Sequence, residues 1–207
     1  MPPSLTATLI EDRFQTLDAV RWKTEAQHPA TQVYAENGEL IIDAPAGVTV
    51  WLVDPLDGDY RIEFRRRVLL GGGRNDRLSD LNQFWAARDP HNPDLFTRSG
   101  ALEEYAALDL YYVGLGGNGN TTTRFRRYDG QGARHLFGEY LDAAHLLRAN
   151  HSYVIRIDVT QEETAFWVDD ERLFHAARHG APSGPGHFGF RSVLSRQAVS
   201  AFRVTRL

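Results

Sequence analysis

The sequence contains no cysteine and no long apolar run. Without cysteine, the 207 residues can form neither a disulfide nor a cysteine-rich zinc site, and no thiol can act as a nucleophile. No stretch approaches the roughly 20 apolar residues of a membrane span, so we expect no membrane partner. The N-terminal sequence MPPSLTATLIEDRF lacks a basic segment followed by an apolar run, which favours a cytoplasmic protein.

Basic residues are also scattered rather than clustered along the chain. The 23 lysines and arginines face 27 acidic residues, which gives a net charge of -4, and no basic stripe indicates a nucleic-acid partner. Aromatic residues are plentiful at 11%, and 42% of the chain is hydrophobic, enough for one core. We therefore predict a single domain over residues 1–207. Both a monomer and a homo-oligomer fit the sequence.

Alternation of apolar and polar residues dominates the chain and predicts many short strands. Asn37-Gly38 and Asp169-Asp170 are typical of tight hairpin turns between such strands. Helical patterns are few and short, at residues 96–108 and 142–148. The clearest alternating segments are residues 60–65, 153–159, 164–168, 187–192 and 201–204. This pattern predicts an all-β fold with two antiparallel sheets packed as a sandwich.

A glycine-rich string at residues 114–119, GLGGNG, matches the G-x-G-x-x-G pattern of dinucleotide-binding turns. That pattern needs a following helix whose N-terminus faces the pyrophosphate. Residues 121–128, TTTRFRRY, are instead typical of a strand, so we reject a dinucleotide site. The loop is either a plain hairpin connection or a ligand-binding element in which Asn118 and Asn120 bind sugar hydroxyls.

Core positions spread over nearly the whole chain follow a known pattern. They are Phe14, Leu17, Asp18, Arg21 and Trp22, then Gly38, Leu40 and Ile42, the strand 60–65, and the later Tyr153, Ile155, Ile157, Phe166, Val168, Asp169, Phe188, Gly189, Phe190, Arg191, Phe202 and Val204. In these positions the chain resembles concanavalin A-like sandwich (jelly-roll) enzymes. Residues 79–85 and 111–128 look like a group of bacterial one-domain sandwich proteins of sugar catabolism, which includes polysaccharide lyases and enzymes acting on 3-keto-glycosides. The resemblance implies a concave sheet with a site for a small carbohydrate.

Several charged side chains should face away from the core. Alternation places Glu63, Arg124 and Arg191 on the outer faces of their strands, opposite the aromatic residues. Arginine binds carboxylates and other oxygen-rich groups through two parallel hydrogen bonds, so these residues could hold a ligand. Arg98 lies in a loop, where binding residues often occur. The alternative is a set of surface Arg–Glu pairs and a solvated Arg98.

The segment Ser79–Trp85 is unusually polar for a strand. Asn82 and Gln83 point to opposite faces, so one of them should be buried or lie in a groove, where its amide needs partners. We consider both a ligand contact by Asn82 and a hydrogen-bonded core network. Trp85 could pack in the core or stack on a sugar ring.

For proton transfer we consider histidine and tyrosine, and select His145 and Tyr112. His145 follows a stretch rich in acids, Glu139 to Asp142. His175 and His179 have metal-like spacing but do not lie on a helix, so we predict no metal site. No motif demands a cofactor, although a divalent cation could replace part of the role of the arginines.

These residues together predict a lyase that acts on an oxidised, keto- or uronate-type sugar. It would break a C–O bond by β-elimination next to a carbonyl or carboxylate. Arg124, Arg191 and Arg98 would stabilise the developing enolate, Asn82 and Asn120 would bind hydroxyls, and Glu63 would orient an arginine or act as acid. The alternatives are a glycoside hydrolase of the same fold, although no E-x-D-x-E strand is present, and a non-catalytic sugar-binding module.

Overall fold

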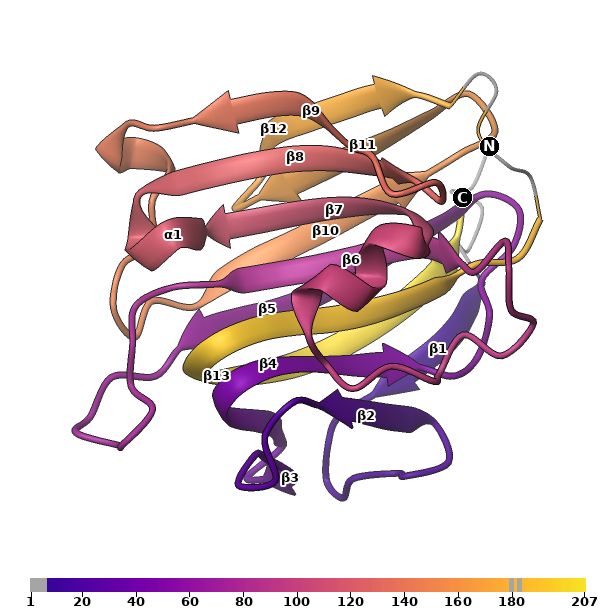
Figure 1. The fold of residues 1–207 in the computed structure, drawn as a ribbon. Coiled ribbons are helices and arrows are strands. Elements are labelled where there is room, and N and C mark those ends of the chain that lie inside the picture. Colours follow the sequence, from indigo (N-terminus) through magenta and orange to yellow (C-terminus); the bar gives the residue numbers. More distant parts are fainter. Residues whose placement is uncertain (1–6, 179–180, 182–183) are drawn as a thin grey trace.

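A computed structural model describes residues 7–178, 181 and 184–207, and it confirms the all-β sandwich (Figure 1). The strands are β1 (Thr8–Asp12), β2 (Trp22–Ala26), β3 (Gln32–Glu36), β4 (Glu39–Leu52), β5 (Tyr60–Val68), β6 (Leu81–Arg88), β7 (Asp109–Gly116), β8 (Thr122–Asp129), β9 (Arg134–Tyr140), β10 (Tyr153–Val159), β11 (Glu163–Val168), β12 (Glu171–Ala177) and β13 (His187–Arg206). Three short helical turns join them: η1 (Leu102–Ala107), α1 (Gly117–Asn120) and η2 (Ala143–His145). No helix in the described ranges is long and apolar enough to cross a membrane.

The strands form two layers because β4 and β13 each take part in both (Figure 1). The first half of β13 pairs with β6 and with the second half of β4, whereas its second half pairs with β5. The register shifts near Leu194, whose φ of 48° bends the chain from one layer to the other. We call the layer of β2, β6, β7, β8 and β9 the front sheet, and the layer of β3, β5, β10, β11 and β12 the back sheet.

The space between the sheets is filled by aliphatic and aromatic side chains. Phe64 contacts Phe188, Phe190 and Phe202, with ring centroids 5.1 to 6.3 Å apart, a spacing typical of favourable aromatic pairs. One charged side chain lies among them: Arg66 is fully buried and donates to the side-chain oxygen of Gln197.

Gln83 and Asn82 are separated as alternation requires. Gln83 points into the core, where its oxygen accepts from Arg66 at 3.4 Å, and Asn82 points to the outer face of the front sheet. The core network and the outward amide, which were alternatives at the sequence level, therefore both occur, in neighbouring residues.

The predicted hairpin turns are confirmed by backbone angles. Asn37 and Gly38 have φ values of 52° and 76°, and Asp169 and Asp170 have 46° and 69°. Both pairs have the positive φ at two successive positions that tight hairpins require.

The glycine-rich string also forms a left-handed turn between β7 and β8. Gly116, Asn118, Gly119 and Asn120 have φ values between 53° and 68°. Glycine and asparagine tolerate this conformation better than other residues. The composition of the string thus has a backbone cause, and no helix follows it.

Candidate functional site

Two rows of side chains cross the outer face of the front sheet, as the strand registers show. Directly paired residues on adjacent strands point to the same face, so each row is continuous. The polar row is Glu25, Thr49, Arg191, Asn82, Gly114, Arg124 and Glu139. The aromatic row is Trp51, Gly189, Phe84, Tyr112 and Arg126. Arginine and amide groups therefore lie beside a row of rings.

Most of the aromatic row is covered by residues 89–108, here called the covering loop, which includes η1 and lies in front of the sheet (Figure 1). Tyr105 of this loop packs on Trp51 and Phe84, with centroids 6.2 and 5.3 Å apart. The loop is anchored on Glu25, which accepts hydrogen bonds from Tyr105 Oη at 2.7 Å, Trp51 Nε1 at 2.8 Å and the Arg98 backbone at 2.8 Å. The part of the outer face that carries most of the aromatic row is therefore closed to solvent by the covering loop.

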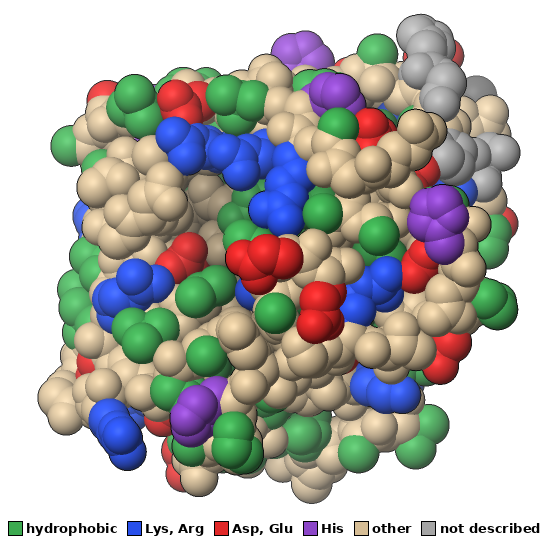
Figure 2. All heavy atoms as spheres, viewed as in Figure 1, with side chains coloured by type: hydrophobic (Ala, Val, Ile, Leu, Met, Phe, Trp, Pro, Cys, Tyr) green, Lys and Arg blue, Asp and Glu red, His purple; other side chains and the backbone are tan. Residues whose placement is uncertain are grey.

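The uncovered part holds a cavity of about 110 Å³, here called the front cavity. Its polar lining comes from Asp80, Asn82, Tyr112, Arg124, Arg126 and Arg191, with Asn118 and Leu102 at its walls. Figure 2 shows basic side chains gathered beside a hollow on this face, over β8. A chain with a net charge of -4 thus concentrates positive charge at one place.

Arg191 is buried and incompletely paired. It is 1% exposed, and its terminal NH1 donates to the Gly100 carbonyl at 2.5 Å and to Thr49 Oγ1 at 3.3 Å. Its Nε and NH2 have no hydrogen-bond partner within the described part of the chain. Burial lowers the pKa of Arg191. A buried donor without a partner is costly, and a bound ligand or an ordered water would satisfy it.

Two more groups at the front cavity are unpaired among the described residues. The Oδ1 of Asn82 accepts no hydrogen bond, although the residue is buried. The Nε of Arg126 is buried and equally without a partner. The cavity therefore combines unused donors with an unused acceptor, the combination that a hydroxylated anionic ligand can satisfy.

Tyr112 is the candidate for proton transfer in this cavity. Burial raises the pKa of its phenol, and Tyr128 and Asp80 raise the pKa further. The phenol is therefore protonated at neutral pH, which is the form that can donate a proton. A Cβ on Gly114 would lie 2.4 Å from Tyr112 Oη, so the glycine leaves the space that this hydroxyl occupies.

Asp80 is the carboxylate that lines the front cavity. Its side chain accepts from Ser79 Oγ at 2.7 Å and from Asn82 Nδ2 at 3.3 Å, and it pairs with Arg77. These contacts fix its position in the cavity lining.

Five of the ten residues selected from the sequence line this one cavity: Asn82, Tyr112, Asn118, Arg124 and Arg191. Their catalytic and binding roles stay predictions. Asp80 and Arg126 were not selected, although alternation alone could have found them. Asp80 is two residues before Asn82 and Arg126 is two residues after Arg124, so each shares the face of its neighbour.

His145 lies elsewhere, at a cavity of about 300 Å³ formed with η2 and the start of β12. Its Nδ1 is 2.7 Å from Asp142, its Nε2 is 3.6 Å from Glu171, and its ring stacks on Tyr140 at 3.8 Å. The structure therefore does not bring His145 together with Tyr112 at the front cavity.

The other four predicted residues have structural contacts. Glu63 lies on the outer face of the back sheet, 3.0 Å from Arg203. Trp85 is in the core, fully buried. Arg98 pairs with an aspartate inside the covering loop, and both amide atoms of Asn120 bond to the Leu147 backbone. None of the four lines the front cavity, and Glu63 lines a separate cavity of about 650 Å³.

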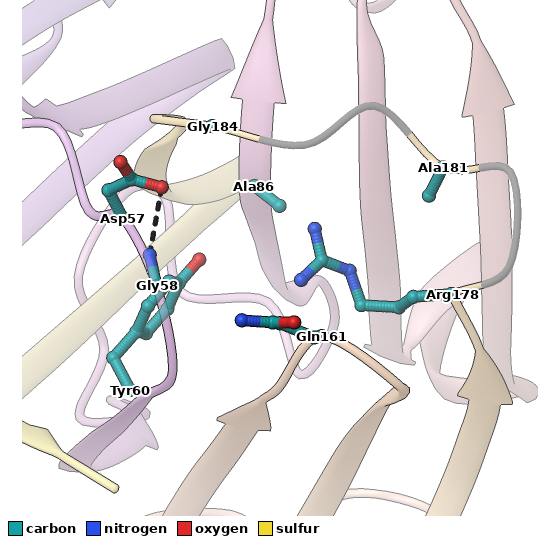
Figure 3. A pocket seen from close by; sticks show the side chains of 8 residues that line it. All are labelled: Asp57, Gly58, Tyr60, Ala86, Gln161, Arg178, Ala181 and Gly184. Carbon is teal, nitrogen blue, oxygen red and sulfur yellow. Dashed lines mark hydrogen bonds between the residues drawn. The ribbon is translucent and has the colours of Figure 1, made fainter.

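A third cavity, of about 400 Å³, lies beside Tyr60 (Figure 3). Arg178 and Gln161 point into it, and Arg178 donates to a backbone carbonyl at 2.7 Å. The front cavity gathers more unpaired polar groups, so we place the candidate site there. His179 of the histidine pair lies outside the described residues, and within the described ranges no cluster of three His, Asp or Glu residues could hold a metal ion.

The chain matches one family model, over residues 42–202. It belongs to the DUF6250 family, a domain of unknown function. No curated protein sequence matches it.

Several solved structures are similar to this chain in fold. A Bacillus subtilis protein of unknown function with a galectin-like fold has a TM-score of 0.77 and 16% identity, over 97% of this chain and 96% of that one. A GH16 endo-β-1,3(4)-glucanase, crystallised with an oligosaccharide at its active site, has a TM-score of 0.68 and 13% identity, over 99% of this chain and 96% of that one. Carbohydrate-binding module CBM66 from Bacillus subtilis has a TM-score of 0.57 and 12% identity, over 89% of this chain and 95% of that one. At these identities the similarity establishes the galectin- and concanavalin A-like sandwich fold.

Proposed function

We propose that this protein binds an acidic sugar in the front cavity and cleaves it by β-elimination. The observation that carries the proposal is the set of unpaired groups on Arg191, Arg126 and Asn82 in one cavity. A sugar carboxylate would satisfy the guanidinium groups, and a sugar hydroxyl would donate to the amide oxygen.

Each of these side chains has its own role in the β-elimination. Asp80 takes the proton from the carbon next to the sugar carboxylate. The arginines stabilise the negative charge that develops on that carboxylate. The electron pair forms a carbon–carbon double bond, the C–O bond to the leaving group breaks, and Tyr112 donates its phenolic proton to the leaving oxygen. A proton returns from Asp80 to the tyrosinate through solvent, which restores both groups.

Sugar ligands are also the common theme of the structural neighbours, which include glucanases and a carbohydrate-binding module. Hydrolysis is the less favoured alternative. A glycosidase generally needs two carboxylates flanking the bond, and in the described lining of the front cavity Asp80 is the sole carboxylate.

The test incubates the protein with oligomers of galacturonate, glucuronate and mannuronate, and follows the ultraviolet absorbance of an unsaturated product. Asp80→Asn and Tyr112→Phe should abolish turnover and retain binding, measured by calorimetry. His145→Ala is the matched control, because its ring lies at another cavity, and it should keep full activity.

Three results would contradict the proposal. New reducing ends without ultraviolet absorbance would indicate a hydrolase. Binding without turnover would indicate a binding module. Loss of activity in His145→Ala alone, with Asp80→Asn and Tyr112→Phe active, would move the site to the other cavity.

A further inference from the structure

The front cavity is bounded in a way that restricts the size of its ligand. On one side the covering loop reaches the cavity with Leu102. On another side the ion pair between Arg124 and Glu139 ties β8 to the edge strand β9. A water-sized group takes about 10–15 Å³ of such a space, so 110 Å³ holds on the order of ten non-hydrogen atoms. This is close to the size of one hexuronic acid residue.

The covering loop is firmly attached to the sheet. Besides its anchor on Glu25, it is held by Arg191, whose NH1 donates to the carbonyl of Gly100 in the loop. The guanidinium of Arg191 also lies 5.0 Å from the ring centroid of Tyr105, a cation–π distance. The residue that lines the cavity thus also fixes the loop that closes it.

A polysaccharide lying across the sheet would have to pass over the aromatic row. That path is filled, because Trp51 and Phe84 are fully buried beneath Tyr105 of the covering loop. An extended chain could therefore place only its end in the front cavity.

We infer that the ligand is a single acidic sugar residue, either free or at the end of a chain, and that interior residues of a polysaccharide do not enter the site. The inference rests on the proposed function, since it concerns the same cavity. It adds that a polysaccharide can be processed only from its end, so an enzyme that cuts long acidic polysaccharides internally would supply such ends.

The test is calorimetric binding of galacturonate, glucuronate and mannuronate as monomers, dimers and octamers to the Asp80→Asn variant, which is expected not to consume them. For binding at chain ends, the affinity per molecule should stay within about twofold from monomer to octamer. For binding along the chain it should rise about eightfold, since each residue is then a site. Binding of the monomer alone would identify a free acid and also supports the inference.

A substitution at the cavity wall provides a second test, with a control at another cavity. Leu102→Trp should fill the space and weaken monomer binding at least about tenfold, whereas His145→Ala, whose ring lies at a different cavity, should leave it nearly unchanged. Affinity that rises with chain length, or Leu102→Trp binding like the parent, overturns the inference while the proposed function survives. Absence of binding by all three acids overturns the proposed function, and the inference with it.

Discussion

Replacing Arg191 by methionine should separate function from stability. Its two unpaired nitrogen atoms are buried donors, each of which costs about 1–3 kcal/mol in the folded state. The two hydrogen bonds of its NH1, to Gly100 and Thr49, contribute about 1.5–3 kcal/mol each because the donor is charged. These effects nearly cancel, so Arg191→Met should change the free energy of unfolding by no more than about 2 kcal/mol.

Arg66 is the matched control, since it is a buried arginine of the same volume in the same molecule. It donates to the carbonyl oxygens of Asn82 and Arg191, at 2.5 and 3.1 Å, and to the side-chain oxygens of Gln83 and Gln197. Arg66→Met would leave several buried acceptors unpaired. We therefore expect it to lower the free energy of unfolding by about 3–5 kcal/mol.

Urea unfolding measures the stability of both variants, and calorimetry with the tightest-binding uronate measures affinity. Arg191→Met should weaken binding about 10- to 100-fold, which corresponds to the loss of one charge-assisted hydrogen bond of about 1.5–3 kcal/mol. The reasoning is refuted if Arg191→Met destabilises the protein as much as Arg66→Met does and leaves the affinity unchanged. Arg191 would then be a structural residue.

Two further predictions concern the buried tyrosines. Gly114→Ala places a methyl group 2.4 Å from Tyr112 Oη, so it should displace that hydroxyl and reduce turnover at least about tenfold. The free energy of unfolding should fall by less than about 3 kcal/mol. Full activity in this variant would show that the hydroxyl is not needed at its present position. Stability should also fall above pH 10, because burial raises the pKa of Tyr60, Tyr105 and Tyr112, and the unfolded chain then loses protons that the folded protein keeps. With Tyr128, whose pKa burial also raises, the four tyrosines together remove about 5.5 kcal/mol per pH unit, and three arginines whose pKa values burial lowers offset up to about 4 kcal/mol. The free energy of unfolding from urea titrations should therefore drop by at least about 1 kcal/mol per pH unit between pH 10 and 12. Tyrosinate absorbance that rises well before unfolding would contradict this.

The features that could be predicted from the sequence are those that depend on neighbouring residues. Alternation in the segment 121–128 predicted that Arg124 faces outward, and Asn37-Gly38 predicted a hairpin turn, because period and turn geometry are properties of a few consecutive residues. The same reasoning cannot tell one sheet from the other. Glu63 also faces outward, but from the back sheet, so its carboxylate lies on the opposite side of the molecule from Arg124.

What could not be predicted is the path of β13, and the front cavity depends on it. The alternating segments 187–192 and 201–204 suggested two strands, whereas one strand runs through both and bends at Leu194. The bend places Arg191 on the outer face of the front sheet and Gln197 in the core directly behind it. Arg66 joins the two sides, since it bonds to the Gln197 side chain and to the backbone carbonyl of Arg191. The polar network of Arg66 and Gln197 inside the sandwich thus supports the backbone of Arg191, whose side chain points outward. This role explains why so apolar a core retains the charged Arg66.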